Sequence, residues 1–481
     1  MCLPITPCGP DSVVMKPIFS FSCAAAGSAT AVAVAASTPA IAMPKPVPRR
    51  MSAPLFSPRL ALPADRLILD NSANRRKQRQ GEQMSAIYER LGVPTLINAK
   101  GAATRLSGGP MPAEVAEAMR EAAAACVDMW TLQGVASERI AAATGAEAGM
   151  ATSGAAAGLL LGTAACLTGL DPGRIARLPD TGGMPAEVVM VRSQRNFYDH
   201  AVRAAGARLV EVGLPDRYSG AGIRDAEPWE IAQAIGPQTA CVFYVAAPQS
   251  RPALSAVADV AHAAGVPVLV DAAAQLPPAE NLRRFIAEGA DLVAFSGGKA
   301  IQGPQASGIL AGKRDLIAAA LLNMLDHDID FALWQPPANL LDKRRLKGLP
   351  PHGIGRSAKV GKEQIVGLMV ALERFQAVDP AAERRRWQGL LEEIVAGLPR
   401  QSPLASRIVA DRGGVPMLEL TLAETPGLGA RDLVLGLQNG RPAIAVDTSR
   451  LEEAILRLNP TCLQAGEPAA IGRRLTKLLG A

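Results

Sequence analysis

One lysine of this chain, Lys299, stands in a glycine-rich turn directly after the apolar run Ala290–Phe295. A second apolar run, Val266–Asp271, ends in an aspartate 28 residues earlier. A lysine amine can form a Schiff base with an aldehyde, and a carboxylate can keep a pyridine nitrogen protonated so that the ring accepts electrons. The pair Lys299 and Asp271 therefore predicts catalysis with pyridoxal 5'-phosphate (PLP).

Both residues also have ordinary structural interpretations. Lys299 could be a surface lysine in a β-turn, and Asp271 could cap the segment that follows its strand. The C-terminal end of a strand is, however, where ligands bind in open parallel sheets. The small residues Ala272–Ala274 leave room for a flat ring there. The pairing of the two residues, with a helical segment and a strand between them, favours the catalytic interpretation.

A phosphate site is predicted where the strand Ala148–Thr152 turns into an apolar helix. The turn consists of Ser153, Gly154, Ala155 and Ala156. Backbone N–H groups at a helix start, together with a serine hydroxyl, can bind a phosphate. The alternative is close packing of a buried helix that is rich in alanine and glycine. Ser296, beside the lysine turn, is a second candidate neighbour of the phosphate or the Schiff base.

Several polar residues are candidates for contact with the ring or the substrate. Arg195 and Tyr198 follow the strand Glu187–Arg192 and should lie at the same sheet edge, although an ordinary helix start is an equal alternative. Arg105 and Arg356 could each hold a substrate anion, or could be solvated basic residues. The sequence contains no HExxH and no GxSxG motif with a triad, and we expect no metal site.

Strands alternate with helices from about Ile87 to Gly312, which predicts an α/β fold with a largely parallel sheet covered on both faces. After Gly312 helices dominate, with a strand at Pro416–Leu422, which predicts a smaller C-terminal α+β domain. We therefore divide the chain into an extension (residues 1–83) that is disordered or not native, a large cofactor-binding domain (84–325) and a small domain (326–481).

The positive charge of the chain belongs to the extension. Residues 1–83 hold 10 Lys and Arg against 4 Asp and Glu, and the remainder holds 40 of each. A neutral body gives no sign of a general nucleic-acid surface. Seven scattered cysteines without a CxxC motif indicate neither a zinc site nor a disulfide framework, so we expect a reducing, cytoplasmic location and no membrane span.

The body of the chain resembles fold-type I PLP enzymes, specifically the group related to L-seryl-tRNA(Sec) selenium transferase (selenocysteine synthase), and within it the D-glucosaminate-6-phosphate ammonia-lyase branch. Several motifs carry the resemblance: Ile97–Gly101, Thr144–Ala148, Thr152–Gly158, Val270–Pro278, Ser296–Lys299, Gly303–Gln305, Gly355–Arg356 and Lys359–Glu363. The resemblance implies an aspartate aminotransferase-like fold with a mixed, mainly parallel seven-stranded sheet. It also implies a homodimer or larger homo-oligomer, with Lys299 bearing the cofactor and Asp271 at the pyridine nitrogen.

Two departures from the family pattern bear on function. The segment Lys100–Arg105 replaces a His-Thr-Asn-Leu-Gly-Arg-type segment of selenocysteine synthases, and with the neutral body this leads us to expect no tRNA partner. Gln194 stands where relatives often have a histidine near the ring. We predict α,β-elimination of the ammonia-lyase type on a small amino acid or amino sugar acid, for which D-glucosaminate 6-phosphate is a candidate. A selenium transferase and a non-catalytic PLP-binding relative are the alternatives.

Overall fold

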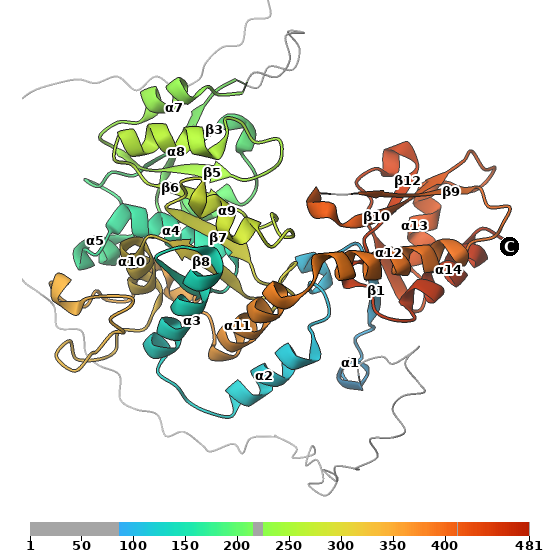
Figure 1. Cartoon of the computed structure of the whole chain (residues 1–481), viewed down its shortest axis with the longest axis horizontal. Helices are drawn as coiled ribbons and strands as arrows, with labels where there is room; N and C mark the ends of the chain where they lie inside the picture. Colours follow the sequence, from blue (N-terminus) through green and yellow to red (C-terminus); the bar gives the residue numbers. More distant parts are fainter. Residues whose placement is uncertain (1–85, 215–224, 411, 481) are drawn as a thin grey trace, which may run out of the picture. The chain divides into compact units, whose positions relative to one another are not determined.

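The computed structural model describes residues 86–214, 225–410 and 412–480 (Figure 1). The predictions made for residues 1–83 lie outside the described residues. In the described residues, no helix combines the length and the apolar character needed to cross a lipid bilayer.

The larger sheet has seven strands in the order β2-β8-β7-β6-β5-β3-β4, which confirms the predicted α/β class (Figure 1). All neighbouring pairs are parallel except those of β8, which runs antiparallel to β2 and β7. The sheet is therefore mixed but mainly parallel. The strands are β2 (Ala148–Thr152), β3 (Glu187–Val191), β4 (Arg208–Val212), β5 (Thr239–Val245), β6 (Val268–Asp271), β7 (Leu292–Ser296) and β8 (Gly308–Gly312).

Helices pack on both faces of this sheet because its central strands are apolar on both sides, as parallel strands usually are. On one face, a Cβ at Gly158 of α4 (Ala155–Thr168) would lie 3.5 Å from the Ala294 Cβ. On the other face, Phe285 of α9 (Asn281–Ala287) meets the ring of Phe295 at 6.0 Å. Successive side chains of β7 thus point to opposite helical layers. The remaining helices around this sheet are α2 (Ala113–Ala123), α3 (Met129–Thr144), α5 (Pro172–Arg177), α6 (Asp199–Ala204), α7 (Pro228–Ala234), α8 (Leu254–Ala263), α10 (Arg314–Met324) and α11 (Lys362–Ala377).

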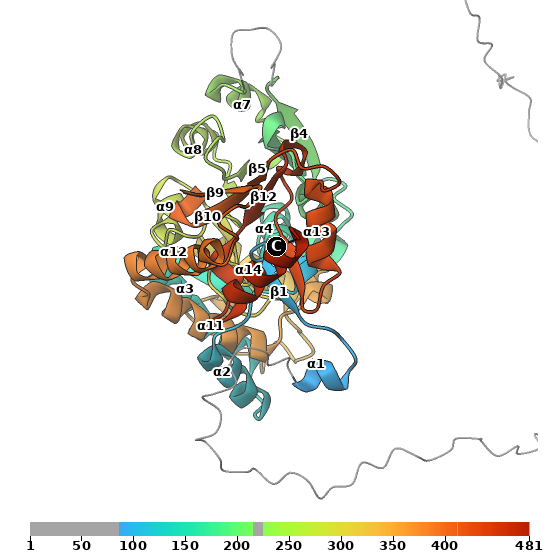
Figure 2. The ribbon, with the colours of Figure 1, turned by 90° about the vertical axis from the view of Figure 1, so that its right-hand side faces the viewer.

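A second hydrophobic core is built mainly from the C-terminal part of the chain. Its three-stranded antiparallel sheet has the order β12-β10-β9, and helices α12, α13 and α14 accompany it (Figures 1 and 2). The short strand β1, near the start of the described chain, pairs in parallel with β11 and contributes Ile97 and Ala99 to this core. The elements are β1 (Leu96–Ala99), β9 (Leu404–Ala410), β10 (Pro416–Leu422), β11 (Ala443–Val446), β12 (Ile455–Leu458), α12 (Pro380–Ala396), α13 (Ala430–Gln438) and α14 (Glu467–Leu478).

The core of the larger sheet continues past residue 325, since it includes Leu372, and the second core resumes at Leu391. The predicted boundaries between residues 83 and 84 and between 325 and 326 stay predictions. Sequence periodicity located strands β4, β5 and β10 at their observed bounds. It did not predict strands β9, β11 and β12, and exposed residues interrupt the alternation along β9.

Close approach of two backbone segments requires a glycine at position 308, at the start of β8. A Cβ at Gly308 would lie 2.5 Å from the Gly154 carbonyl carbon and 2.8 Å from the Ala155 nitrogen. Gly389, exposed on α12, would meet nothing within 4 Å. We expect Gly308→Ala to lower the free energy of unfolding by about 1–3 kcal/mol through overpacking. The control Gly389→Ala should raise it by about 0.5–1 kcal/mol because alanine is the better helix former. Urea denaturation measures both, and a neutral Gly308→Ala would contradict the packing described.

Candidate active site

The register of the sheet brings the predicted site residues to one edge. Thr152, at the end of β2, pairs with Gly308, and Gly308 pairs on its other side with Ser296 at the end of β7. Asp271 ends β6 beside β7, with Ala294 as its partner in register. The carboxyl ends of these parallel strands are the usual ligand-binding edge of an open sheet. Ser153, Ser296 and Asp271 therefore lie along the same edge, and Lys299 follows in the loop after β7.

The loop that carries Lys299 is closed by hydrogen bonds of its own backbone. The Gly303 N–H donates to the Gly297 carbonyl, the Gln302 N–H donates to the Lys299 carbonyl, and each distance is 2.9 Å. The Gly297 N–H also donates to the Ser307 carbonyl at 2.9 Å. A Cβ at Gly298 would lie only 2.8 Å from the Gln305 Cα, so the turn cannot accommodate a larger residue without shifting. The lysine thus projects from a fixed loop rather than a flexible one.

Lys299 and Asp271 perturb each other across this edge. Burial lowers the pKa of the Lys299 amine, and the carboxylate of Asp271 offsets part of that shift. Burial likewise raises the pKa of Asp271, while a hydrogen bond from the Ala273 N–H at 3.0 Å and the charge of Lys299 act in the opposite direction. Desolvation outweighs attraction for both groups. The site consequently offers a lysine amine that is easier to deprotonate and a carboxylate that lacks a full set of partners for its charge.

The predicted phosphate turn has an open backbone. Gly154, the residue before α4, has φ 144° and ψ 165°, and a Cβ there would meet nothing within 4 Å. The Thr152 hydroxyl donates to the Gly154 carbonyl at 2.9 Å, and the Ser153 hydroxyl donates to the Ala358 carbonyl at 2.9 Å. The N–H groups in the first turn of α4 have no carbonyl within their own helix. They are thus available to an anion placed before Ala155 and Ala156.

Gln194 is held beside the same edge by its amide. Its Oε1 accepts the Val245 N–H at 2.9 Å, and its Nε2 donates to the Arg251 carbonyl at 3.2 Å. Val245 is the partner of Asp271 in register, so Gln194 lies one strand away from the carboxylate. The side chain is 6% exposed. Its fixed amide joins the end of β5 to the loop that follows.

Three of the predicted substrate residues, Arg195, Tyr198 and Arg105, do not line the cavity at Lys299. Arg195 pairs with Asp199 at 2.5 Å and with Glu211, so its charge is neutralised. Tyr198 and Arg105 are exposed, and neither lines the cavity into which Lys299 opens. The sequence predicted the sheet edge on which Arg195 and Tyr198 lie, but it gave no information about these ion pairs.

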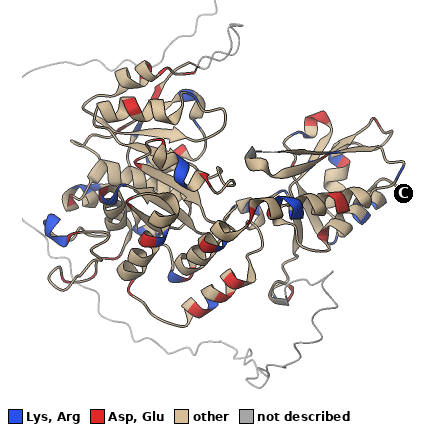
Figure 3. Ribbon diagram, viewed as in Figure 1, with Lys and Arg blue, Asp and Glu red and all other residues tan. Residues whose placement is uncertain are grey.

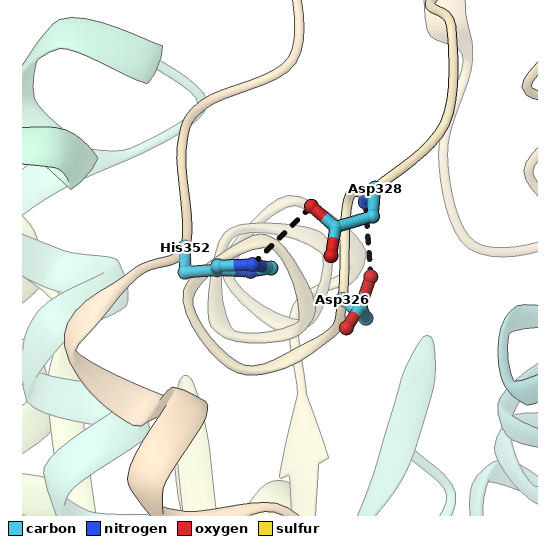
Figure 4. A group of neighbouring side chains, drawn as sticks. All are labelled: Asp326, Asp328 and His352. Atoms are coloured by element: carbon cyan, nitrogen blue, oxygen red, sulfur yellow. Dashed lines mark hydrogen bonds and ion pairs between the residues drawn. The ribbon is translucent and has the colours of Figure 1, made fainter. Parts of the chain in front are cut away.

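Arg356, the fourth predicted substrate residue, belongs to a polar group after α10. Its Nη2 pairs with Asp326 at 3.1 Å. Beside this pair, His352 pairs with Asp328 at 3.4 Å (Figure 4). Asp326, Asp328 and His352 are all exposed, with one potential ligand atom each within 4.8 Å of the others. The Asp328 N–H also donates to Asp326 at 2.9 Å. These contacts give each residue a partner within the protein, and the group does not line the cavity at Lys299.

Lys299 lines a cavity of about 930 Å³, and the other charged residues of its lining were not predicted from the sequence. Only their places along the chain pointed to this cavity. Arg251 comes shortly after β5 and Arg284 lies on α9, both near the carboxyl edge of the sheet. Arg384 is one of three consecutive arginines, Arg384–Arg386, on an amphipathic helix, and the sequence does not distinguish it from the other two. The charged residues of the lining are Arg251, Arg284, Glu288, Lys299, Arg374, Glu383 and Arg384.

Comparison with known proteins places this site in a family. Residues 198–329 match the SelA family, described as L-seryl-tRNA selenium transferase. The chain is 32% identical over 403 residues to D-glucosaminate-6-phosphate ammonia lyase from Salmonella typhimurium, covering 82% of this chain and 97% of the relative. It is 30% identical over 405 residues to a 5'-C-glycyluridine monooxygenase-decarboxylase from a Streptomyces species, covering 82% and 92%.

A solved structure of a D-glucosaminate-6-phosphate ammonia-lyase superposes with a TM-score of 0.68 at 31% identity, covering 83% of this chain and 99% of that one. The chain therefore has the fold of the fold-type I PLP-dependent enzymes. It belongs to the SelA-like family of these enzymes, in which D-glucosaminate-6-phosphate ammonia lyase is one of its relatives.

The electrostatics of Lys299 give a prediction for its reactivity. An amine reacts with acylating reagents only when unprotonated, so a lowered pKa moves half-maximal labelling to a lower pH than the usual ~10.4 of lysine. Asp271→Asn removes the charge that raises this pKa, and should move the profile lower still. Peptide mass spectrometry of protein labelled across a pH series measures both profiles, with exposed Lys477 as internal reference. A Lys299 profile identical to that of Lys477 would contradict the burial described.

Proposed function

We propose that this protein binds PLP through Lys299 and Asp271. The observation that carries the proposal is that buried Asp271 and half-buried Lys299 lie on neighbouring strand ends at the carboxyl edge of the sheet, close enough for each charge to act on the other, beside an open helix N-terminus. These residues fit PLP. Burial favours the neutral form of the Lys299 amine, and the Asp271 carboxylate could pair with a protonated pyridine nitrogen. The Ser153–Ala156 turn presents unpaired N–H groups toward open space, where a phosphate could bind. Ser296 and Gln194 border the same region.

Bound PLP would supply an electron sink for a carbanion at the substrate α-carbon. The chain's own residues would do the rest. Asp271 would keep the pyridine nitrogen protonated, and the first turn of α4 would anchor the phosphate. The Lys299 Nζ would take the α-proton, which requires an amine with a pKa near the working pH. The direction of the Lys299 shift supports this role.

The reaction we propose is α,β-elimination with release of ammonia from a 2-amino acid that carries a β-hydroxyl group. The α C–H bond and the β C–O bond break, the hydroxyl leaves as water, and hydrolysis of the resulting unsaturated amine gives a 2-keto acid and ammonia. The support is the 32% identity over nearly the full length of the Salmonella ammonia lyase. D-Glucosaminate 6-phosphate is the substrate we would test first.

The selenium transferase alternative has weaker support. The family model matches residues 198–329, and a selenium transferase from Moorella thermoacetica is 28% identical over 57% of this chain, less on both counts than the ammonia lyase. Outside residues 1–83, the chain carries 40 basic and 40 acidic residues, and Figure 3 shows both signs interspersed along the described helices. Binding to tRNA normally needs a positive surface. We therefore propose a small-molecule amino substrate and a cytoplasmic homo-oligomer.

Covalent trapping tests the cofactor. We expect borohydride reduction with PLP to add one pyridoxyl group to the Lys299 peptide, detected by mass spectrometry. Lys299→Ala should lose both the adduct and the visible absorbance of the holoenzyme, while Lys477→Ala on the last helix should retain them. Modification spread over surface lysines, with none at Lys299, would refute the proposal.

Product analysis tests the reaction. We expect the holoenzyme to release ammonia and a 2-keto acid from D-glucosaminate 6-phosphate or a related amino acid. Lys299→Ala should lower turnover by at least ~10²–10⁴-fold because it removes the general base. Release of carbon dioxide instead would indicate decarboxylation. Tight, salt-sensitive binding of seryl-tRNA would favour the transferase.

A further inference from the structure

The cavity at Lys299 contains more positive charge than its own carboxylates neutralise. Two of its arginines are paired: Arg284 contacts Glu288 at 2.6 Å, and Arg374 contacts Glu114 at 2.8 Å. Glu383, the other acid of the lining, forms an ion pair with an arginine outside the lining, Arg386. Apart from Lys299, this leaves two arginines of the lining, Arg251 and Arg384, without a carboxylate partner among the described residues.

Neither Arg251 nor Arg384 forms an ion pair with any described residue. The Arg251 Nη1 donates only to main-chain carbonyls, those of Ser250 at 2.8 Å and Pro248 at 3.3 Å. The guanidinium of Arg384 lies beside backbone, since a Cβ at Gly414 would be 3.2 Å from its Nη2. Guanidinium groups bind carboxylates and phosphates through paired N–H donors. Both side chains therefore have donors available for an anion in the cavity.

Arg251 is tied to the catalytic edge through Gln194. The Gln194 amide joins the Arg251 carbonyl to the Val245 N–H, and Val245 is the partner of Asp271 in register. The backbone of Arg251 is thus fixed relative to the Asp271 carboxylate. The Arg251 side chain lines the cavity from this point.

Arg384 lies near Pro277, in the segment Ala272–Pro278 that follows Asp271. A Cβ at Gly413 would collide with the Pro277 carbonyl, so the loop before β10 rests against this segment. Gly414 of the same loop is the residue adjacent to Arg384. Arg384 and Arg251 therefore approach the cavity from two different elements, α12 and the loop after β5.

The volume of the cavity exceeds what a short amino acid requires. Pockets of about 300–1,000 Å³ hold drug-sized ligands, and this one lies near the upper end at about 930 Å³. PLP bound at Lys299 would take part of this volume, and a two- or three-carbon amino acid carries no second anion to pair with the two arginines. An elongated substrate with a second anion would fill this space and neutralise the charge.

We infer that Arg251 and Arg384 are specificity-determining residues that bind an anionic group, a phosphate or a carboxylate, at the end of the substrate remote from the reacting α-carbon. This inference rests on the proposed function, because it assigns the distal end of the substrate of the same site. Arg105, Arg195 and Arg356, the arginines predicted from the sequence, do not line this cavity, and their role stays a prediction.

Calorimetric titration of the borohydride-reduced, PLP-treated chain tests the inference without turnover. The ligands are D-glucosaminate 6-phosphate, D-glucosaminate, which lacks the phosphate, and 2-aminoadipate, which ends in a carboxylate. We expect Arg251→Ala and Arg384→Ala each to weaken binding of the ligand with the matching terminal anion by roughly ten- to a hundred-fold, the loss of one or two charge-assisted hydrogen bonds. Binding of D-glucosaminate should change little. Arg385→Ala is the matched control, because Arg385 is adjacent on α12 but lies outside the cavity lining.

The possible outcomes separate cleanly. A selective loss for the phosphate ligand identifies a phosphate site, and a selective loss for 2-aminoadipate identifies a carboxylate site. Equal losses for D-glucosaminate would overturn the inference, since the arginines would then bind the carboxylate near the reacting carbon. An absence of binding by both anionic ligands, or unchanged binding in both variants, would also overturn it. Failure of the proposed function is seen separately, as absence of pyridoxyl-Lys299 in the mass spectrum of the same sample.

Discussion

The burial of two opposite charges at one sheet edge is the constraint on which the rest of the site depends. Lys299 and Asp271 both pay a desolvation penalty that their mutual attraction does not cancel, as the directions of their pKa shifts indicate. Such an arrangement is unfavourable for an isolated protein. It becomes favourable once a group arrives that uses a neutral amine and a charged carboxylate together. The fold must therefore hold the two residues in place at a cost in stability.

The surrounding backbone provides this rigidity. The lysine loop is closed by its own hydrogen bonds, and glycines at 298 and 308 permit contacts that any side chain would block. The parallel register sets Asp271 level with Val245 and Ala294. Gln194 then ties β5 to the following loop. Strained or unfavourable groups persist only where the structure around them is over-determined, and this edge of the sheet meets that condition.

The sequence predicted the parts of the site that follow from local pattern and strand order. Asp271 and Ser153 were found because each ends or follows an apolar strand, and parallel strands bring their carboxyl ends together. Arg251 and Arg384 were missed because side-chain pairing over long separations decides which arginine is neutralised. Arg195 and Arg356 looked equivalent to them in sequence, yet each has a carboxylate partner in the structure. The pairing of β1 with β11 was also not predicted, because it joins two four-residue strands that are far apart in sequence.

This difference between paired and unpaired arginines bears on how members of one family acquire different substrates. The Lys299–Asp271 pair and the α4 N-terminus depend on the sheet, so they are fixed by the architecture common to the fold. Arg251 lies in the loop after β5, and Arg384 lies on α12. Neither element is part of the turn that carries Lys299. Substitutions at these positions would alter the charge of the cavity without disturbing the sheet edge. The relatives named as an ammonia lyase and as a monooxygenase-decarboxylase, at 32% and 30% identity, carry names of two different reactions.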